Sequence, residues 1–184
     1  IRKPVLVRKC PYNSLLYAGS YESECLIMDI EIRKAELTDI DLLMKWRMRV
    51  LREVFAIPEN EPAEELERKN RIYYQSALQA GGHIACFACQ GEEIIGCGGI
   101  CLYQEMPSPD NLSGQCAYLM NIYTCPDFRG LGVGETVVKW LAGQAVQRNI
   151  TKIYLETSKP DRKLYEKAGF IDMPDMMKLQ PVKI

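Results

Sequence analysis

Apolar residues recur along the chain with two spacings, one typical of strands and the other typical of helices. Alternating or continuous runs of β-branched and aromatic residues predict strands at 30–35, 83–90, 93–103, 117–124, 152–156 and 176–180. Apolar residues three or four positions apart predict helices over 40–54, 61–77 and 133–146, and a short helix between 158 and 169. We therefore expect an α/β (α+β) fold in which helices flank a sheet.

The strand at 117–124 leads into a glycine-rich turn and then into a helix. Pro126 has no backbone N–H for a sheet ladder, so the strand is expected to stop before it. After Arg129, glycine occupies alternate positions, namely Gly130, Gly132 and Gly134. Glycine permits positive φ and close approach of the backbone, and the first N–H groups of a helix attract anions. An ordinary tight turn needs fewer glycines, so the pattern favours a phosphate site, to which Arg129 adds a planar set of donors.

Two common phosphate motifs do not fit this turn. A dinucleotide fingerprint would need a third glycine where Glu135 stands, and the Gly-Lys-Ser/Thr triplet of a P-loop is absent from the sequence. The pattern Arg-x-x-Gly-x-Gly at 129–134 resembles the acyl-CoA-binding motif of the GNAT superfamily of N-acyltransferases. A second motif of that family, Leu-Tyr-Glu-Lys-Ala-Gly-Phe, follows at 164–170. The resemblance extends over about 29–179, which is nearly the whole chain.

The resemblance implies a mixed, mostly antiparallel sheet of about six or seven strands that binds acetyl-CoA or coenzyme A as co-substrate. In this family the central strand offers its backbone to the pantetheine arm, and the glycine-rich turn holds the pyrophosphate. The implied cofactor-binding residues are Ile122, Tyr123, Thr124, Arg129, Gly130, Leu131, Gly132, Val133 and Gly134. Many relatives also carry an asparagine before the short helix. Pro160 occupies that region here, which leaves Ser158 as the expected substitute.

The implied catalytic residue is Tyr165, whose hydroxyl would protonate the departing thiolate with a pKa near the ordinary value of about 10. Alternatively, Tyr165 is an aromatic residue of an amphipathic helix, and its ring only packs under the sheet. Glu53 and Glu105 are candidates for binding the substrate or acting as the base, although the amine can also lose its proton to water. The single histidine, His83, stands at the start of a strand and is expected to be structural.

Composition excludes several other classes of protein. The chain has 184 residues, 26 % charged residues and a formal net charge of −1, so neither a nucleic-acid footprint nor a membrane-surface patch is expected. No apolar run approaches the roughly 18 residues of a spanning helix, and the first residues do not resemble a secretory signal. Of the eight cysteines, only Cys86 and Cys89 form a close pair, and on a strand their sulfurs would face opposite ways. We therefore expect reduced thiols, no bound metal and a cytoplasmic protein.

These observations predict two segments and one leading function. Residues 28–184 are expected to form a single GNAT-type domain, and 1–27 an ordered extension that docks on the domain or on a neighbouring chain. The leading function is transfer of an acetyl group from acetyl-CoA to a small-molecule or peptide amine by direct attack in a ternary complex. A CoA-binding sensor without turnover is the alternative, and a nucleotide-binding structural protein is disfavoured. The acceptor, the acyl length and a homodimer are left open.

Overall fold

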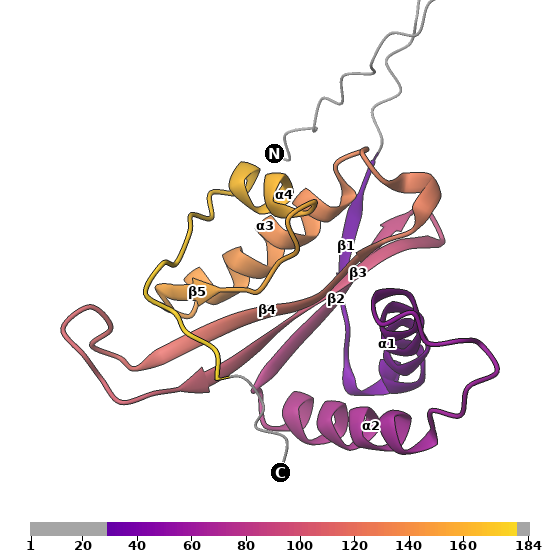
Figure 1. Ribbon diagram of the computed structural model, residues 1–184, viewed down its shortest axis with the longest axis horizontal. Coiled ribbons are helices and arrows are strands. Elements are labelled where there is room, and N and C mark those ends of the chain that lie inside the picture. The colour runs from indigo at the N-terminus through magenta and orange to yellow at the C-terminus, as the bar shows by residue number, and fades with distance from the viewer. Residues whose placement is uncertain (1–28, 180–184) are drawn as a thin grey trace, which may run out of the picture.

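The computed structural model describes residues 29–179, in which five strands form one sheet in the order β1-β2-β3-β4-β5 (Figure 1). The strands are β1 (Glu31–Lys34), β2 (His83–Gln90), β3 (Glu93–Gln104), β4 (Gln115–Thr124) and β5 (Lys152–Tyr154). Neighbouring strands are antiparallel except β4 and β5, which run parallel. The mixed, mostly antiparallel sheet is thus confirmed, with fewer strands than the expected six or seven.

Helices cover both faces of this sheet. The helices α1 (Ile40–Val54) and α2 (Glu64–Gln79) lie on one face, and α3 (Val133–Val146) and α4 (Arg162–Lys167) lie on the other (Figure 1). Two short 3-10 turns, η1 (Leu37–Asp39) and η2 (Pro126–Phe128), precede α1 and follow β4. The predicted bounds of α1 and α3 are confirmed, whereas α2 begins at Glu64 rather than at residue 61.

The sheet separates two hydrophobic clusters because side chains alternate along each strand. In β2, Ile84 and Cys86 pack toward α3, while Phe87 packs toward α1 and α2. Cys89 belongs to the α1 side, so the two close cysteines do face opposite ways. On the α3 face the helix approaches β3 closely, because a Cβ at Gly98 would lie only 2.5 Å from Cγ1 of Val137.

The structure differs from the expectation for two strands in the last third of the chain, and it does not describe the extension at the start. The strand predicted at 152–156 ends at Tyr154. The strand predicted at 176–180 is wrong for 176–179, which are not strand and are exposed, Met177 by 98 %. None of the five described strands pairs with this segment, and an apolar run becomes a strand only where it exchanges hydrogen bonds with a neighbouring strand. The extension at 1–27 lies outside the described residues, as does residue 180.

Three further properties hold for the described part of the chain. None of the helices within 29–179 combines the length and the apolar character needed to cross a bilayer. In the same residues, no three His, Cys, Asp or Glu side chains come close enough to hold a metal ion. The cysteines of this part are free thiols, namely Cys86, Cys89, Cys97, Cys101, Cys116 and Cys125.

Candidate functional site

The glycine-rich turn after β4 presents a row of unused backbone donors. Gly130 and Gly132 both have left-handed backbones, with φ of +78° and +89°, as the sequence predicts. The first hydrogen bond of α3 runs from the N–H of Thr136 to the carbonyl of Gly132 at 3.0 Å. Among the described residues, no backbone hydrogen bond uses the N–H groups of 130–135. These six consecutive groups, at the positive end of a helix dipole, form a site suited to a phosphate.

Gly134 serves a different purpose from the two other glycines of the turn. It lies inside α3 and has no positive φ, contrary to the expectation for all three glycines. A Cβ at this position would lie 3.3 Å from Cδ2 of Leu164 and 3.5 Å from Oγ1 of Thr124. Gly134 therefore allows α3 to approach α4 and the end of β4.

The side chain of Arg129 is held by groups of the protein. Its Nη2 forms an ion pair with Glu53 of α1, and its Nε donates to the carbonyl of Thr124 at 3.1 Å. The other oxygen of Glu53 accepts a hydrogen bond from the hydroxyl of Tyr123 at 2.7 Å. The bonds from Tyr123 and Arg129 lower the pKa of Glu53, so this carboxylate is a weak base. Glu53 thus positions the turn, and the backbone N–H row provides the open donors.

The open edge of β4 lies beside this turn. The parallel ladder between β4 and β5 pairs only residues 116–118 with 152–154. From residue 119 to Thr124, β4 has no strand partner on this side within the described part of the chain. Ile122, Tyr123 and Thr124, which were expected to offer their backbone to the pantetheine arm, belong to this free stretch.

Tyr165 lies in α4, and Ser158 lies in the loop that precedes this helix. The half-buried ring of Tyr165 contacts Phe170 edge-on, with centroids 6.1 Å apart. Burial, and to a smaller extent Asp161 and Tyr118, raise the pKa of Tyr165 to about 12, above the ordinary value expected from the sequence. A higher pKa keeps the phenol protonated, which an acid requires. Ser158 is exposed and its hydroxyl donates to Asp161 at 2.5 Å, within the loop that precedes α4.

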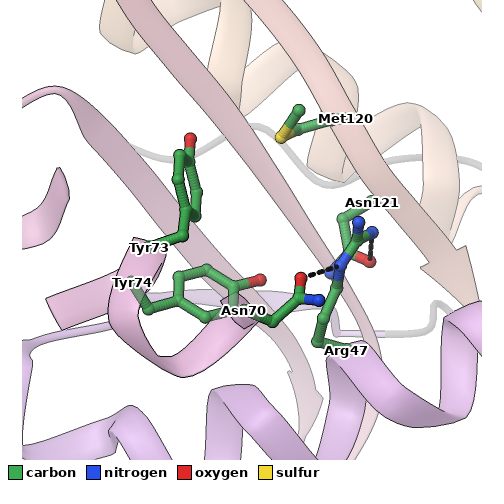
Figure 2. A pocket seen from close by; sticks show the side chains of 6 residues that line it. All are labelled: Arg47, Asn70, Tyr73, Tyr74, Met120 and Asn121. Atoms are coloured by element: carbon green, nitrogen blue, oxygen red, sulfur yellow. Dashed lines mark hydrogen bonds between the residues drawn. The ribbon is translucent and has the colours of Figure 1, made fainter. Parts of the chain in front are cut away.

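A pocket opens on the α1 and α2 side of β4 (Figure 2). Its volume is about 170 Å³, and its lining comes from Arg47, Asn70, Tyr73, Tyr74, Met120 and Asn121. Arg47 donates from Nε to the amide oxygen of Asn70 at 2.9 Å and from Nη1 to that of Asn121 at 3.0 Å. The sequence patterns described above do not predict this pocket. Its one local signal is Asn121, a polar residue in an otherwise apolar stretch of strand.

His83 packs against two residues that line this pocket. It is 4 % exposed, its Nδ1 lies 3.1 Å from the hydroxyl of Tyr73, and its ring contacts the rings of Tyr73 and Tyr74 edge-on. Burial and the positive charge of Arg47 lower the pKa of His83 to about 4. Its Nε2 has no partner within the described residues and faces Gly99, where a Cβ would lie 2.7 Å away. These contacts agree with a structural role.

Glu105 lies away from the turn, at the other end of β4. Its carboxylate pairs with Lys152 at 2.7 Å and accepts a hydrogen bond from the buried Asn111 at 3.3 Å. Lys152 is the neighbour of Cys116, near the first residues of β4. Glu105 therefore ties the loop between β3 and β4 to β5, and the structure does not bring it together with Ile122–Thr124.

Comparison with known proteins agrees with this geometry. Residues 43–170 match the sequence profile of the Acetyltransferase (GNAT) family. A predicted acetyltransferase from Clostridium acetobutylicum, crystallised with acetyl-CoA, has a TM-score of 0.72 and 30 % identity over 83 % of this chain and 96 % of that chain. Glucosamine-6-phosphate N-acetyltransferase from Arabidopsis thaliana shares the fold, with a TM-score of 0.61 and 18 % identity over 85 % of this chain and 99 % of that chain. The uncharacterized N-acetyltransferase ycf52 of Pyropia yezoensis is 36 % identical over 66 residues, which span 36 % of this chain and only 38 % of that relative.

Proposed function

Because the chain belongs to the Acetyltransferase (GNAT) family, we propose that it transfers the acetyl group of acetyl-CoA to a primary amine of a small molecule or peptide. The observation that carries this proposal is the row of free N–H groups at 130–135. This row follows the part of β4 that no longer pairs with β5. The row offers donors for the pyrophosphate of CoA, and the open edge of β4 offers backbone groups for the pantetheine arm. The pocket on the other face, beside Met120 and Asn121, offers a place for the amine.

The transfer needs no covalent enzyme intermediate, because a thioester is already activated. The lone pair of the amine attacks the thioester carbonyl carbon, a C–N bond forms, and the resulting oxyanion then expels the sulfur as the C–S bond breaks. Tyr165 gives its proton to the departing thiolate and later regains one from water. The proton of the amine passes to water, since Glu53 has a lowered pKa and His83 a pKa of about 4.

A thiol-release assay tests the proposal. Acetyl-CoA is incubated with the protein and with amino acids, polyamines, aminoglycosides or peptides, and the free thiol and the acetylated product are both measured. We expect amine-dependent thiol release that is lost in the Gly132→Asp variant. Tight CoA binding without transfer to any amine would favour the sensor function, and absence of both binding and transfer would reject both.

A further inference from the structure

The pocket beside β4 contains a cation, Arg47, with which no acidic side chain of residues 29–179 forms an ion pair. Arg47 extends from α1 into the pocket, where the two hydrogen bonds drawn in Figure 2 hold its guanidinium. Both acceptors are neutral amides, and none of the ion pairs among residues 29–179 involves Arg47. The acidic residues of α1 and α2 that do form ion pairs have other cationic partners, as in Asp41 with Arg71 and Glu53 with Arg129.

The two amides fix the guanidinium without using all of its donors. Asn70 donates from its own Nδ2 to the carbonyl of Leu66 at 2.8 Å, which keeps its amide oxygen turned toward Arg47. Asn121 lies in β4 with a left-handed φ of +57°, and its oxygen holds the other side of the group. An arginine has five N–H donors, and Nε and one hydrogen of Nη1 are engaged, so three remain. Donors on a pre-positioned planar fork suit a carboxylate or a phosphate.

The charge of Arg47 acts on the groups around the pocket. It adds to the lowering of the pKa of His83 and opposes the rise that burial causes in the pKa values of Tyr73 and Tyr74. His83 is therefore neutral at physiological pH, so the positive charge beside these rings is that of Arg47. A purely cationic ligand such as a polyamine would be repelled, whereas an anionic group would be attracted.

We propose that Arg47 binds an anionic group of the acceptor, so that the substrate is a primary amine that also carries a carboxylate or a phosphate. This inference rests on the proposed transferase function. The anion pairs with the free edge of the guanidinium, and the amine is thereby directed toward the free stretch of β4. The nearby positive charge also favours the neutral form of the amine, which is the form that attacks the thioester.

Matched pairs of amines test the inference. One pair is an aminoalkyl phosphate and the corresponding aminoalkyl alcohol, and the other is an amino acid and its carboxamide; a polyamine is included as a cationic probe. In the wild type we expect a higher kcat/KM for the anionic member of at least one pair, and the larger ratio identifies the anion. In Arg47→Gln this ratio should fall about 10- to 100-fold through KM, as when a charged group loses its hydrogen-bonded partner.

Two control variants and the ratio itself separate recognition from a merely structural role. Lys45→Gln removes one positive charge from an exposed position of the same helix and should leave the ratio unchanged. Arg47→Lys keeps the charge but not the planar fork, so it should retain part of the preference. Loss of structure alone would lower the rates of both members of a pair equally, leaving their ratio unchanged. That result in a folded Arg47→Gln protein, or equal use of both members by the wild type, would overturn the inference.

A binding measurement keeps this test independent of turnover. The anionic amine is titrated into CoA-saturated protein, wild type and Arg47→Gln, and the heat of binding is recorded. Weaker binding in the variant supports the inference even when no acetyl group is transferred. Transfer without any preference for anions would leave the transferase function intact and refute the role of Arg47.

Discussion

Replacing Gly132 with aspartate places a negative charge at the centre of the proposed phosphate site without a steric clash. A Cβ at this position meets no atom within 4 Å, so the folded state loses stability only through the backbone φ of +89°. A left-handed backbone costs an L-residue about 1–2 kcal/mol, which a domain of ordinary stability, roughly 5–15 kcal/mol, tolerates. Gly132→Asp is therefore expected to fold.

The effect on CoA binding should be larger than the effect on folding. A carboxylate about 5 Å from one phosphate charge is repelled by about 3 kcal/mol at an effective dielectric constant of about 20. That repulsion corresponds to roughly 100-fold weaker binding. Because part of it is screened by ions, the loss should shrink as the ionic strength is raised.

Calorimetric titration of CoA measures this loss, and Gly81→Asp is the matched control. Gly81 also has a positive φ, +70°, and open space around a Cβ, and aspartate there makes the same charge change. Gly81 lies between α2 and β2. The carbonyl of the next residue, Gly82, accepts a hydrogen bond from the N–H of Leu102, which lies in the half of β3 remote from the glycine-rich turn. Wild-type CoA affinity in folded Gly132→Asp would refute the phosphate assignment, and an equal loss in Gly81→Asp would show that the effect is not local.

Three further predictions concern the acid, the buried histidine and the thiols. Tyr165→Phe should lower kcat roughly 100-fold with little change in acetyl-CoA affinity, and with a pKa of about 12 the phenol should cause no alkaline loss of rate below about pH 11. Wild-type kcat in this variant, when chemistry limits turnover, would leave water as the proton source. The pKa of His83 is lowered from 6.5 to about 4, so the unfolded chain binds its proton more tightly, and the free energy of unfolding should fall by about 3 kcal/mol between pH 6.5 and 4. Urea unfolding should show a shallower acid dependence in His83→Gln, and an unchanged slope would contradict the prediction. A thiol reagent should titrate eight groups in the denatured, unreduced chain, and fewer would reveal disulfides.

Local signals in the sequence were sufficient where neighbouring residues determine the structure. The turn could be predicted because Gly130 and Gly132 each adopt a backbone that other residues rarely adopt. The bounds of α1, α3 and β2 follow from the spacing of apolar residues. The strand predicted at 176–180 is absent at 176–179. A strand also requires hydrogen bonds to a neighbouring strand, and the local sequence does not reveal whether one is present.

The missed parts of the site depend on residues far apart in the chain. Arg47 meets Asn70 and Asn121, which are 23 and 74 residues away, and Arg129 meets Glu53 across 76 residues. No spacing rule predicts such pairs, because they form only when α1 and α2 pack on β4. For this reason the sequence alone presents Glu53 as a candidate substrate or base group, whereas in the structure it contacts Tyr123 and Arg129 and holds the turn.

One residue of β4 links the two halves of the site. Cys97 pairs with Tyr123 and Gly99 with Met120, so two residues of β4, Asn121 and Ile122, oppose a single residue of β3. This bulge, at the left-handed Asn121, changes which face the following side chains occupy.

Without the bulge, alternation would place Tyr123 on the same face as Leu119, toward α3. With it, Met120 and Asn121 both line the pocket, and Tyr123 packs on the α1 face, where its hydroxyl reaches Glu53. Asparagine tolerates the left-handed backbone better than most residues and also supplies the amide oxygen that Arg47 requires. A single irregularity in the strand therefore both opens the pocket for the amine and fixes, through Tyr123 and Glu53, the turn for the phosphate.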